Sequence, residues 1–279
     1  MRRRCVLAAA CIALISLIGS VPAAAQSVVV APQMVVLDAR SRTASVVLVN
    51  QEATPAEVTL SFFYGYPETD AEGTMRLRTF EVVLDSMPSS AEWIRSYPDR
   101  LVLKPYERRA VRLFANPPAD LASREYWTRL MVAVRGRRLP VAGVAGVGIS
   151  VGLDLEVRSI LGVFYRPADL STGVALDDVR TALEQDTLVV RARLTRQGNA
   201  AFVGSLLATL RDERQQIVST TTLPLGVYYS LEPRMLLPVG TLAPGNYELT
   251  LEAVSTRPDL SPQSLLPALP ARAILSVRM

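Results

Sequence analysis

From Ser27 onward the sequence is a series of short apolar runs, rich in β-branched residues and separated by Pro, Gly, Asn and Asp. Short runs of this composition are typical of β-strands, whereas an amphipathic helix needs a longer apolar pattern that repeats every ~3.6 residues. In the first half of the chain we expect strands at Val28–Leu37, Ala44–Asn50, Ala56–Tyr64, Met75–Leu84, Arg100–Leu103, Arg109–Phe114, Tyr126–Arg135 and Ile149–Tyr165. So many strands in about 140 residues, with turn signals between them, favour a β-sandwich.

A second series of strands follows a break at Arg166–Leu170, after which Ser171-Thr172-Gly173 has the composition of a short hinge. Here we expect a strand from Val174 and further strands at Thr187–Thr195, Gly204–Arg211, Ile217–Leu223, Arg234–Pro238, Tyr247–Val254 and Ala273–Val277. The segment Leu242–Leu249 resembles the turn before a late strand of many immunoglobulin-like domains, and the proline-rich Ser255–Leu269 is expected to be a loop. We therefore predict an all-β protein of two immunoglobulin-like β-sandwich domains, residues 26–168 and 169–279.

The first 25 residues have the pattern of a secretory signal peptide. Met1–Arg4 is positively charged, Val6–Ile18 is apolar but short for a membrane span, and Ala23-Ala24-Ala25 fits a cleavage site. We expect cleavage after Ala25, with an uncleaved anchor as the alternative. Removing the three arginines of this segment leaves 27 of the 30 basic residues against 26 acidic ones, so the mature net charge falls from +4 to near +1. This balance does not predict a nucleic-acid partner, which normally requires a clustered cationic face.

The composition excludes several classes of enzyme. The chain has no histidine, both cysteines, Cys5 and Cys11, lie in the predicted signal peptide, and Lys104 is the only lysine. Ser-His-Asp and Cys-His catalysis, imidazole and thiolate metal sites, and a phosphate-binding Gly-Lys loop are therefore not available to the mature chain. We expect no enzyme activity, no cofactor and no metal site.

The most informative stretch is Ile149-Ser-Val-Gly-Leu-Asp-Leu-Glu-Val157, in which aliphatic residues occupy every second position. Because side chains alternate across a strand, the five aliphatic side chains point the same way at intervals of about 6.6 Å. One interpretation is a strand that completes the core of its own domain. The other is an exposed edge, because the strand follows an apolar, glycine-rich segment, 140–148, which is unusual in a monomer unless something covers it. The aliphatic residues are Ile149, Val151, Leu153, Leu155 and Val157.

Three segments of the first domain resemble the periplasmic pilus-assembly chaperones. Val163-Phe164-Tyr165-Arg166-Pro167 is similar to the family's Leu-Phe-Tyr-Arg-Pro signature at the end of its last N-domain strand. Leu101–Leu113 resembles Leu-x-Pro-Gly-x-x-x-x-Val-Arg-Leu, and Ser123-Arg124-Glu125 before Tyr126-Trp127 resembles Asp-Arg-Glu-Ser. The resemblance covers Val28–Leu170, and the second domain matches only as a generic immunoglobulin-like fold.

This resemblance implies donor-strand complementation in the periplasm. A pilin-type subunit is an incomplete sandwich, and the chaperone completes it by adding an edge strand whose alternate aliphatic side chains enter the subunit's groove. The five aliphatic residues of the alternating stretch would be that donor strand, and no ATP would be required. The partners implied are secreted subunits of pilin type, while the sequence leaves open whether an outer-membrane usher takes part or whether the protein self-associates through the same edge.

Two positions depart from the family pattern. The family binds the subunit's terminal carboxylate with two basic residues in the cleft between the domains, and here those positions hold Met34 and Gly162. We expect Arg158, Arg40 or Arg42 to substitute for them, unless the scaffold serves another partner.

Glu125 and Arg166, by contrast, match the family's interdomain pair. We expect them to form a structural ion pair, because a charge at a domain junction is usually kept by pairing.

Other polar and aromatic groups fit structural roles better than catalytic ones. The adjacent carboxylates Asp177 and Asp178 would point to opposite faces of a strand, which disfavours both a glycosidase pair and a calcium site. Trp93 and Trp127 are expected in the core or at the domain junction. The sequence thus predicts a periplasmic chaperone, with a structural or adhesive immunoglobulin-like protein of the cell envelope as the alternative.

Overall fold

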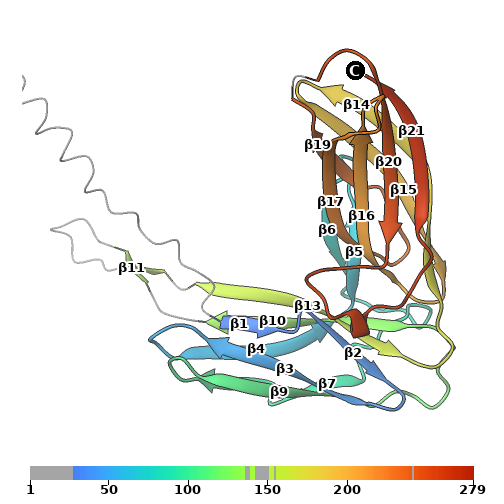
Figure 1. The fold of residues 1–279 in the computed structure, drawn as a ribbon. Coiled ribbons are helices and arrows are strands. Elements are labelled where there is room, and N and C mark those ends of the chain that lie inside the picture. The colour runs from blue at the N-terminus through green and yellow to red at the C-terminus, as the bar shows by residue number, and fades with distance from the viewer. Residues whose placement is uncertain (1–27, 136–138, 142–150, 154, 241) are drawn as a thin grey trace, which may run out of the picture.

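The computed structural model describes residues 28–135, 139–141, 151–153, 155–240 and 242–279, with the backbone alone for 139–141 and 151–153. The predicted signal peptide lies outside these residues. The described chain is all-β and forms two immunoglobulin-like sandwiches that meet at one end and stand at an angle to each other (Figure 1). Among the described residues, no helix combines the length and the apolar character of a membrane span.

The first sandwich contains a four-stranded sheet of order β1-β3-β9-β7 and a five-stranded sheet of order β2-β13-β10-β4-β8. The four-stranded sheet consists of β1 (Val28–Ala31), β3 (Thr43–Asn50), β9 (Arg108–Ala115) and β7 (Ile94–Tyr97). The five-stranded sheet consists of β2 (Met34–Asp38), β13 (Glu156–Arg166), β10 (Tyr126–Arg135), β4 (Ala56–Phe63) and β8 (Arg100–Leu103). Two smaller pairs are β5 (Gly65–Thr69) with β6 (Met75–Thr79) and β11 (Leu139–Val141) with β12 (Val151–Leu153).

Alternation of apolar and polar residues builds the core of this sandwich. Val46 and Leu48 in β3, Val111 in β9, and Leu161 and Val163 in β13 are all buried, and their neighbours along each strand point away. Because side chains alternate along a strand with a period of two residues, these buried residues all lie on the face of their strand that points toward the other sheet. The apolar pattern seen in the sequence is therefore the inner face of the sandwich.

The strand expected over Val28–Leu37 is in fact two strands in different sheets. β1 pairs with β3, whereas β2 runs parallel to β13, so the chain changes sheet between Ala31 and Met34. Pro32 lies at this change, where it has no N–H to donate to a ladder. The prediction of one continuous strand was wrong because both halves are apolar, and only the pairing separates them.

The second sandwich packs a sheet of order β14-β15-β18, with β19 also paired to β15, on a sheet of order β17-β16-β20-β21. Its strands are β14 (Thr172–Glu184), β15 (Thr187–Gly198), β16 (Phe202–Arg211), β17 (Ile217–Val227), β18 (Ser230–Leu231), β19 (Arg234–Pro238), β20 (Asn246–Val254) and β21 (Ala271–Arg278). A 3₁₀ turn, Pro262–Ser264, is the regular element within the expected loop Ser255–Leu269. The core of this sandwich includes Leu194, Phe202, Leu210 and Leu251, all fully buried.

The β5–β6 hairpin was not expected from the sequence. A single strand was predicted over Met75–Leu84, but β6 ends at Thr79 and pairs with β5, which the polar sequence Gly65–Thr69 did not indicate. Most of the hairpin's residues are exposed or half-buried, so it carries no clear alternation of apolar and polar residues.

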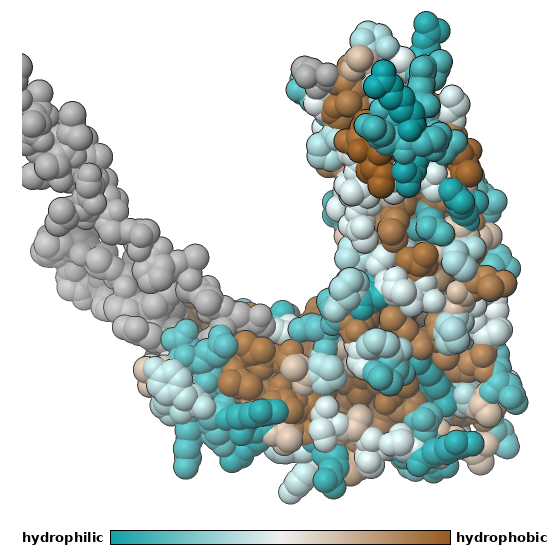
Figure 2. Space-filling model, in the orientation of Figure 1, coloured by the Kyte–Doolittle hydropathy of each residue, from teal (hydrophilic) through white to brown (hydrophobic). Residues whose placement is uncertain are grey.

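A separate apolar cluster joins the two sandwiches. Trp127 and Phe164 of the first domain are buried together with Tyr228 and Val203 of the second, and the Trp127 and Tyr228 rings meet edge to face with centroids 5.0 Å apart. Such edge-to-face contacts add to the gain from burial. In Figure 2 hydrophobic residues gather at the inner corner where the two sandwiches meet.

Candidate functional site

One edge of β13 is only partly covered by the described strands. β10 pairs with β13 antiparallel from Glu156 to Tyr165, and β2 pairs with its other edge in parallel from Gly162 to Arg166. The described strands thus reach this second edge only from Gly162 onward. A strand edge beyond its partner presents backbone N–H and C=O groups to which another chain can add.

The predicted contact residues occupy the start of this edge. Val157 is on the same face of β13 as buried Leu161 and Val163, yet its side chain is 39% exposed, and Leu155, two residues earlier, is 46% exposed. The face of the strand therefore passes from the core into solvent along its length. Two of the five predicted donor residues present exposed aliphatic surface here.

The other three predicted contact residues are placed differently. Val151 and Leu153 belong to β12, whose backbone pairs with β11, and Ile149 lies outside the described residues. The stretch expected as one strand, Ile149–Tyr165, is described as two strands, β12 paired with β11 and β13 paired with β10. The alternation in the sequence does not show which neighbour each part pairs with.

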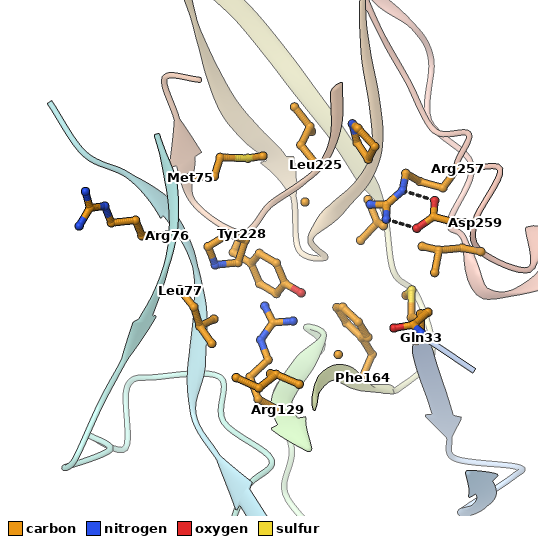
Figure 3. A pocket seen from close by; sticks show the side chains of 18 residues that line it. Gln33, Met75, Arg76, Leu77, Arg129, Phe164, Leu225, Tyr228, Arg257 and Asp259 are labelled. Atoms are coloured by element: carbon orange, nitrogen blue, oxygen red, sulfur yellow. Dashed lines mark hydrogen bonds and ion pairs between the residues drawn. The ribbon is translucent and has the colours of Figure 1, made fainter. Parts of the chain in front are cut away.

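The other face of β13 opens on a cavity of about 640 Å³ between the domains (Figure 3). Ile160 and Phe164 of β13 line it from the first domain, and Leu225 and Tyr228 from the second. Met34 and Gly162, the two positions at which the family has basic residues, pair with each other in the β2–β13 register and both line this cavity. The two positions thus lie in the cleft, as the sequence predicted, and neither residue carries a charge.

The cavity contains a cation that the sequence analysis missed, Arg129 of β10. Arg129 is directly opposite Gly162 in the β10–β13 register, and a Cβ added to Gly162 would lie 3.1 Å from Nη1 of Arg129. The guanidinium thus occupies the space above the glycine. Its Nε donates to the carbonyl of Gly65 at 3.0 Å, and its Cζ lies 4.9 Å from the ring centroid of Tyr228.

Arg129 differs from the other arginines around the cavity. Arg257 is held by Asp259, with Nε 2.7 Å from Oδ1, and Arg76 is held by Asp70, with Nε 2.7 Å from Oδ2. Among the described residues, no carboxylate lies within 4.0 Å of Arg129. Burial raises the pKa of the Tyr228 hydroxyl, which Arg129 opposes, so at neutral pH this group remains a phenol that can donate a hydrogen bond. A guanidinium that has no carboxylate partner among the described residues and lies beside a phenol is suited to an anion.

The substitutes expected from the sequence do not line the cavity. Arg158 donates from Nε to Oε1 of Glu156 at 2.6 Å on the exposed start of β13, and Arg40 and Arg42 are exposed in the turn between β2 and β3. Arg129 could not have been identified in their place without the register of β10 against β13. Adjacent strands bring residues together that are far apart in sequence, and the sequence does not state which ones face each other.

Glu125 and Arg166 lie together at the domain junction. Nε of Arg166 is 2.7 Å from Oε1 of Glu125, whose side chain is fully buried. Each residue also reaches the second domain: the backbone N–H of Ala201 donates to Oε2 of Glu125 at 3.0 Å, and Nη1 of Arg166 donates to the carbonyl of Ser264 at 2.8 Å. Burial raises the pKa of the Glu125 carboxyl, and the Arg166 guanidinium opposes this. The pair is therefore well placed to fix one domain against the other.

Comparison with known proteins gives similarity at the level of the fold. No family model and no curated protein matches the chain. The crystal structure of the YadV chaperone shares 13% sequence identity, covers 90% of this chain and 100% of that chain, and gives a TM-score of 0.46. The SafB chaperone, solved in complex with the Salmonella enterica SafA pilin, shares 13% identity over 91% of this chain and 98% of that chain, with a TM-score of 0.43. The Pseudomonas aeruginosa CupB2 chaperone shares 12% identity over 90% and 100%, with a TM-score of 0.40.

Proposed function

We propose that this protein is a periplasmic, ATP-independent chaperone that binds an incomplete immunoglobulin-like subunit of pilin type by donor-strand complementation. The start of β13 would add to the subunit's sheet, with main-chain hydrogen bonds holding the added strand and alternate side chains filling the subunit's groove. The observation that carries the proposal is the exposure of Leu155 and Val157 on a strand edge that the described strands do not reach. The predicted signal peptide and the three sequence segments that resemble the chaperone family support it.

The exposed surface sets the scale of the expected affinity. Complete burial of an aliphatic side chain gains ~1.5–3 kcal/mol, so burying the remaining exposed part of Leu155 and Val157 would gain about half of that for each. The rest of the binding energy is then expected from Ile149, Val151 and Leu153, from main-chain hydrogen bonds and from the cleft. A client held by many moderate contacts along one strand can be released without ATP when another strand replaces the donor.

We assign the anchoring of the client's terminal carboxylate to Arg129. In this proposal the end of the subunit enters the cavity along the second face of β13 and meets the guanidinium above Gly162, with the Tyr228 hydroxyl as an additional donor. A charge-assisted hydrogen bond of this kind is roughly twice as strong as a neutral one, and it would set the register of the subunit along β13.

The test is co-purification of secreted client proteins with Leu155→Glu. We expect this variant to lose the clients that wild type retains after co-expression with neighbouring secreted proteins, because a carboxylate cannot enter an apolar groove. The control is Leu183→Glu in β14, since Leu183 is 52% exposed and distant from β13. Equal loss with both variants would contradict the donor-strand assignment. Unfolding of the first domain by Leu155→Glu would instead favour a strand that completes its own core, and hence a structural or adhesive protein.

A further inference from the structure

The β5–β6 hairpin leaves the first sandwich after β4 and extends along the second. In Figure 1 its strands run along the second sandwich, away from the two sheets of the first, and β5 contacts β18. Two sandwiches joined by the short connection from Pro167 to Ser171 would ordinarily be expected to move against each other unless their interface is large. A segment of one domain that is bound along the other would restrict this motion.

Three hydrogen bonds attach the tip of the hairpin to the second domain. The Thr69 hydroxyl accepts from the backbone N–H of Glu232 at 2.9 Å, and the Gly73 carbonyl accepts from the backbone N–H of Arg234 at 2.9 Å. The third is donated by Nη1 of Arg191 to the carbonyl of Ala71, also at 2.9 Å. The tip is therefore bound through the Thr69 hydroxyl and two backbone carbonyls to the segment that leads into β19 and to β15.

The approach at Gly73 is closer than a side chain allows. Gly73 has a φ of 81°, and a Cβ added to it would lie 2.9 Å from both the N and the Cβ of Arg234. A positive φ and so close a contact are both tolerated by glycine and by few other residues. Beside it, Met75 packs against the core of the second sandwich.

The base of the hairpin is attached to the domain junction and to Arg129. Tyr66 meets Tyr229 edge to face with ring centroids 4.8 Å apart, and the carbonyl of Gly65 accepts the hydrogen bond from Nε of Arg129. The hairpin is thus held at both ends, by the second sandwich at its tip and by the junction at its base.

The same hairpin forms a wall of the cavity. Pro67, Met75 and Leu77 line it, and Figure 3 shows Met75 and Leu77 on the side opposite Gln33 and Asp259. We propose that the β5–β6 hairpin is an interdomain brace, which fixes the separation of the two sandwiches, and hence the width of the cleft, before any partner binds. The importance of that width rests on the proposed function, but the brace itself does not.

The test measures the distance between the domains in the client-free, full-length protein. Cys5 and Cys11 are the only cysteines and both lie in the predicted signal peptide, so new cysteines can be introduced into the mature chain in place of exposed Arg112 in β9 and exposed Arg214 in the second domain. Nitroxide labels at these two sites report the distribution of interdomain distances by pulsed electron paramagnetic resonance. We expect wild type to give one narrow distribution.

Two variants weaken the brace to different degrees. Gly73→Val should broaden and shift the distribution, because the added side chain cannot fit against Arg234. Thr69→Val, which keeps the shape and removes one acceptor, should broaden it less. Glu72→Gln, at an exposed position between them, is the matched control and should leave it unchanged.

The brace is refuted if Gly73→Val retains the narrow wild-type distribution, or if wild type is already as broad as the variant. Circular dichroism shows whether each variant is folded, and Thr69→Val keeps the proposal testable if Gly73→Val is not. Loss of clients in Leu155→Glu with an unchanged interdomain distance would support the proposed function independently of the brace, so the two proposals can fail separately.

Discussion

Replacing Arg166 with methionine tests how much the buried Glu125–Arg166 ion pair contributes to the free energy of unfolding. Glu125 is fully buried and accepts from Arg166 and from the Ala201 backbone, so Arg166→Met would leave a buried carboxylate without its cation. Removing one partner of a buried pair typically costs about 3–5 kcal/mol, because the remaining charge stays desolvated without compensation. We expect a loss of this size in the free energy of unfolding near neutral pH, measured by urea denaturation.

The loss should depend on pH in a defined direction. Burial already raises the pKa of Glu125 above its ordinary value of 4.5, and Arg166 opposes that rise, so the pKa should be higher still in the variant. A carboxyl whose folded pKa is raised contributes stability that is fully present below its unfolded pKa and is lost as the pH rises through the folded pKa. The deficit of Arg166→Met relative to wild type should therefore be larger at about pH 8 than at about pH 5, where Glu125 is more often protonated.

A double-mutant cycle with Glu125→Gln separates the pair from the other contacts of Arg166. The double variant should be more stable than the sum of the two single losses implies, because each single variant leaves one unpaired group. A deficit for Arg166→Met that is equal at the two pH values, together with zero coupling in the cycle, would refute the reasoning. The effect would then come from the lost hydrogen bond to Ser264 and not from the buried carboxylate.

Three further predictions concern separate parts of the molecule. Gly204→Ala should destabilise the second sandwich by ~1–3 kcal/mol in urea unfolding, because the new Cβ would lie 2.1 Å from the carbonyl oxygen of Val254; Gly173→Ala, with its nearest atom at 3.5 Å, should have little effect. Asn50→Ala should lower the free energy of unfolding by ~1–3 kcal/mol, since the buried amide donates to the carbonyls of Thr54 and Lys104. A change in urea midpoint no larger than that of a surface variant would contradict this. Arg129→Gln should weaken client co-purification while the protein remains folded, whereas Arg76→Gln, at an arginine on the same cavity that is held by Asp70, should leave co-purification unchanged.

The sequence determined the class of fold and pointed to the strand proposed here as the donor, because both inferences depend on short-range patterns. Alternation of apolar residues at Leu161 and Val163 is a local property of one strand, and the Phe-Tyr-Arg-Pro segment at its end is equally local. The sequence also determined that the cleft holds no charge at Met34 or Gly162.

Tertiary structure alone decided which residues meet across strands and domains. Arg129 lies above Gly162 because of the β10–β13 register, and a register depends on pairing between segments distant in sequence. The tip of the β5–β6 hairpin is held on the second domain by hydrogen bonds, most of them to backbone carbonyls, and such bonds leave no apolar pattern in the sequence. The division of Val28–Leu37 between two sheets likewise follows from its partners, β3 and β13, and not from its own composition.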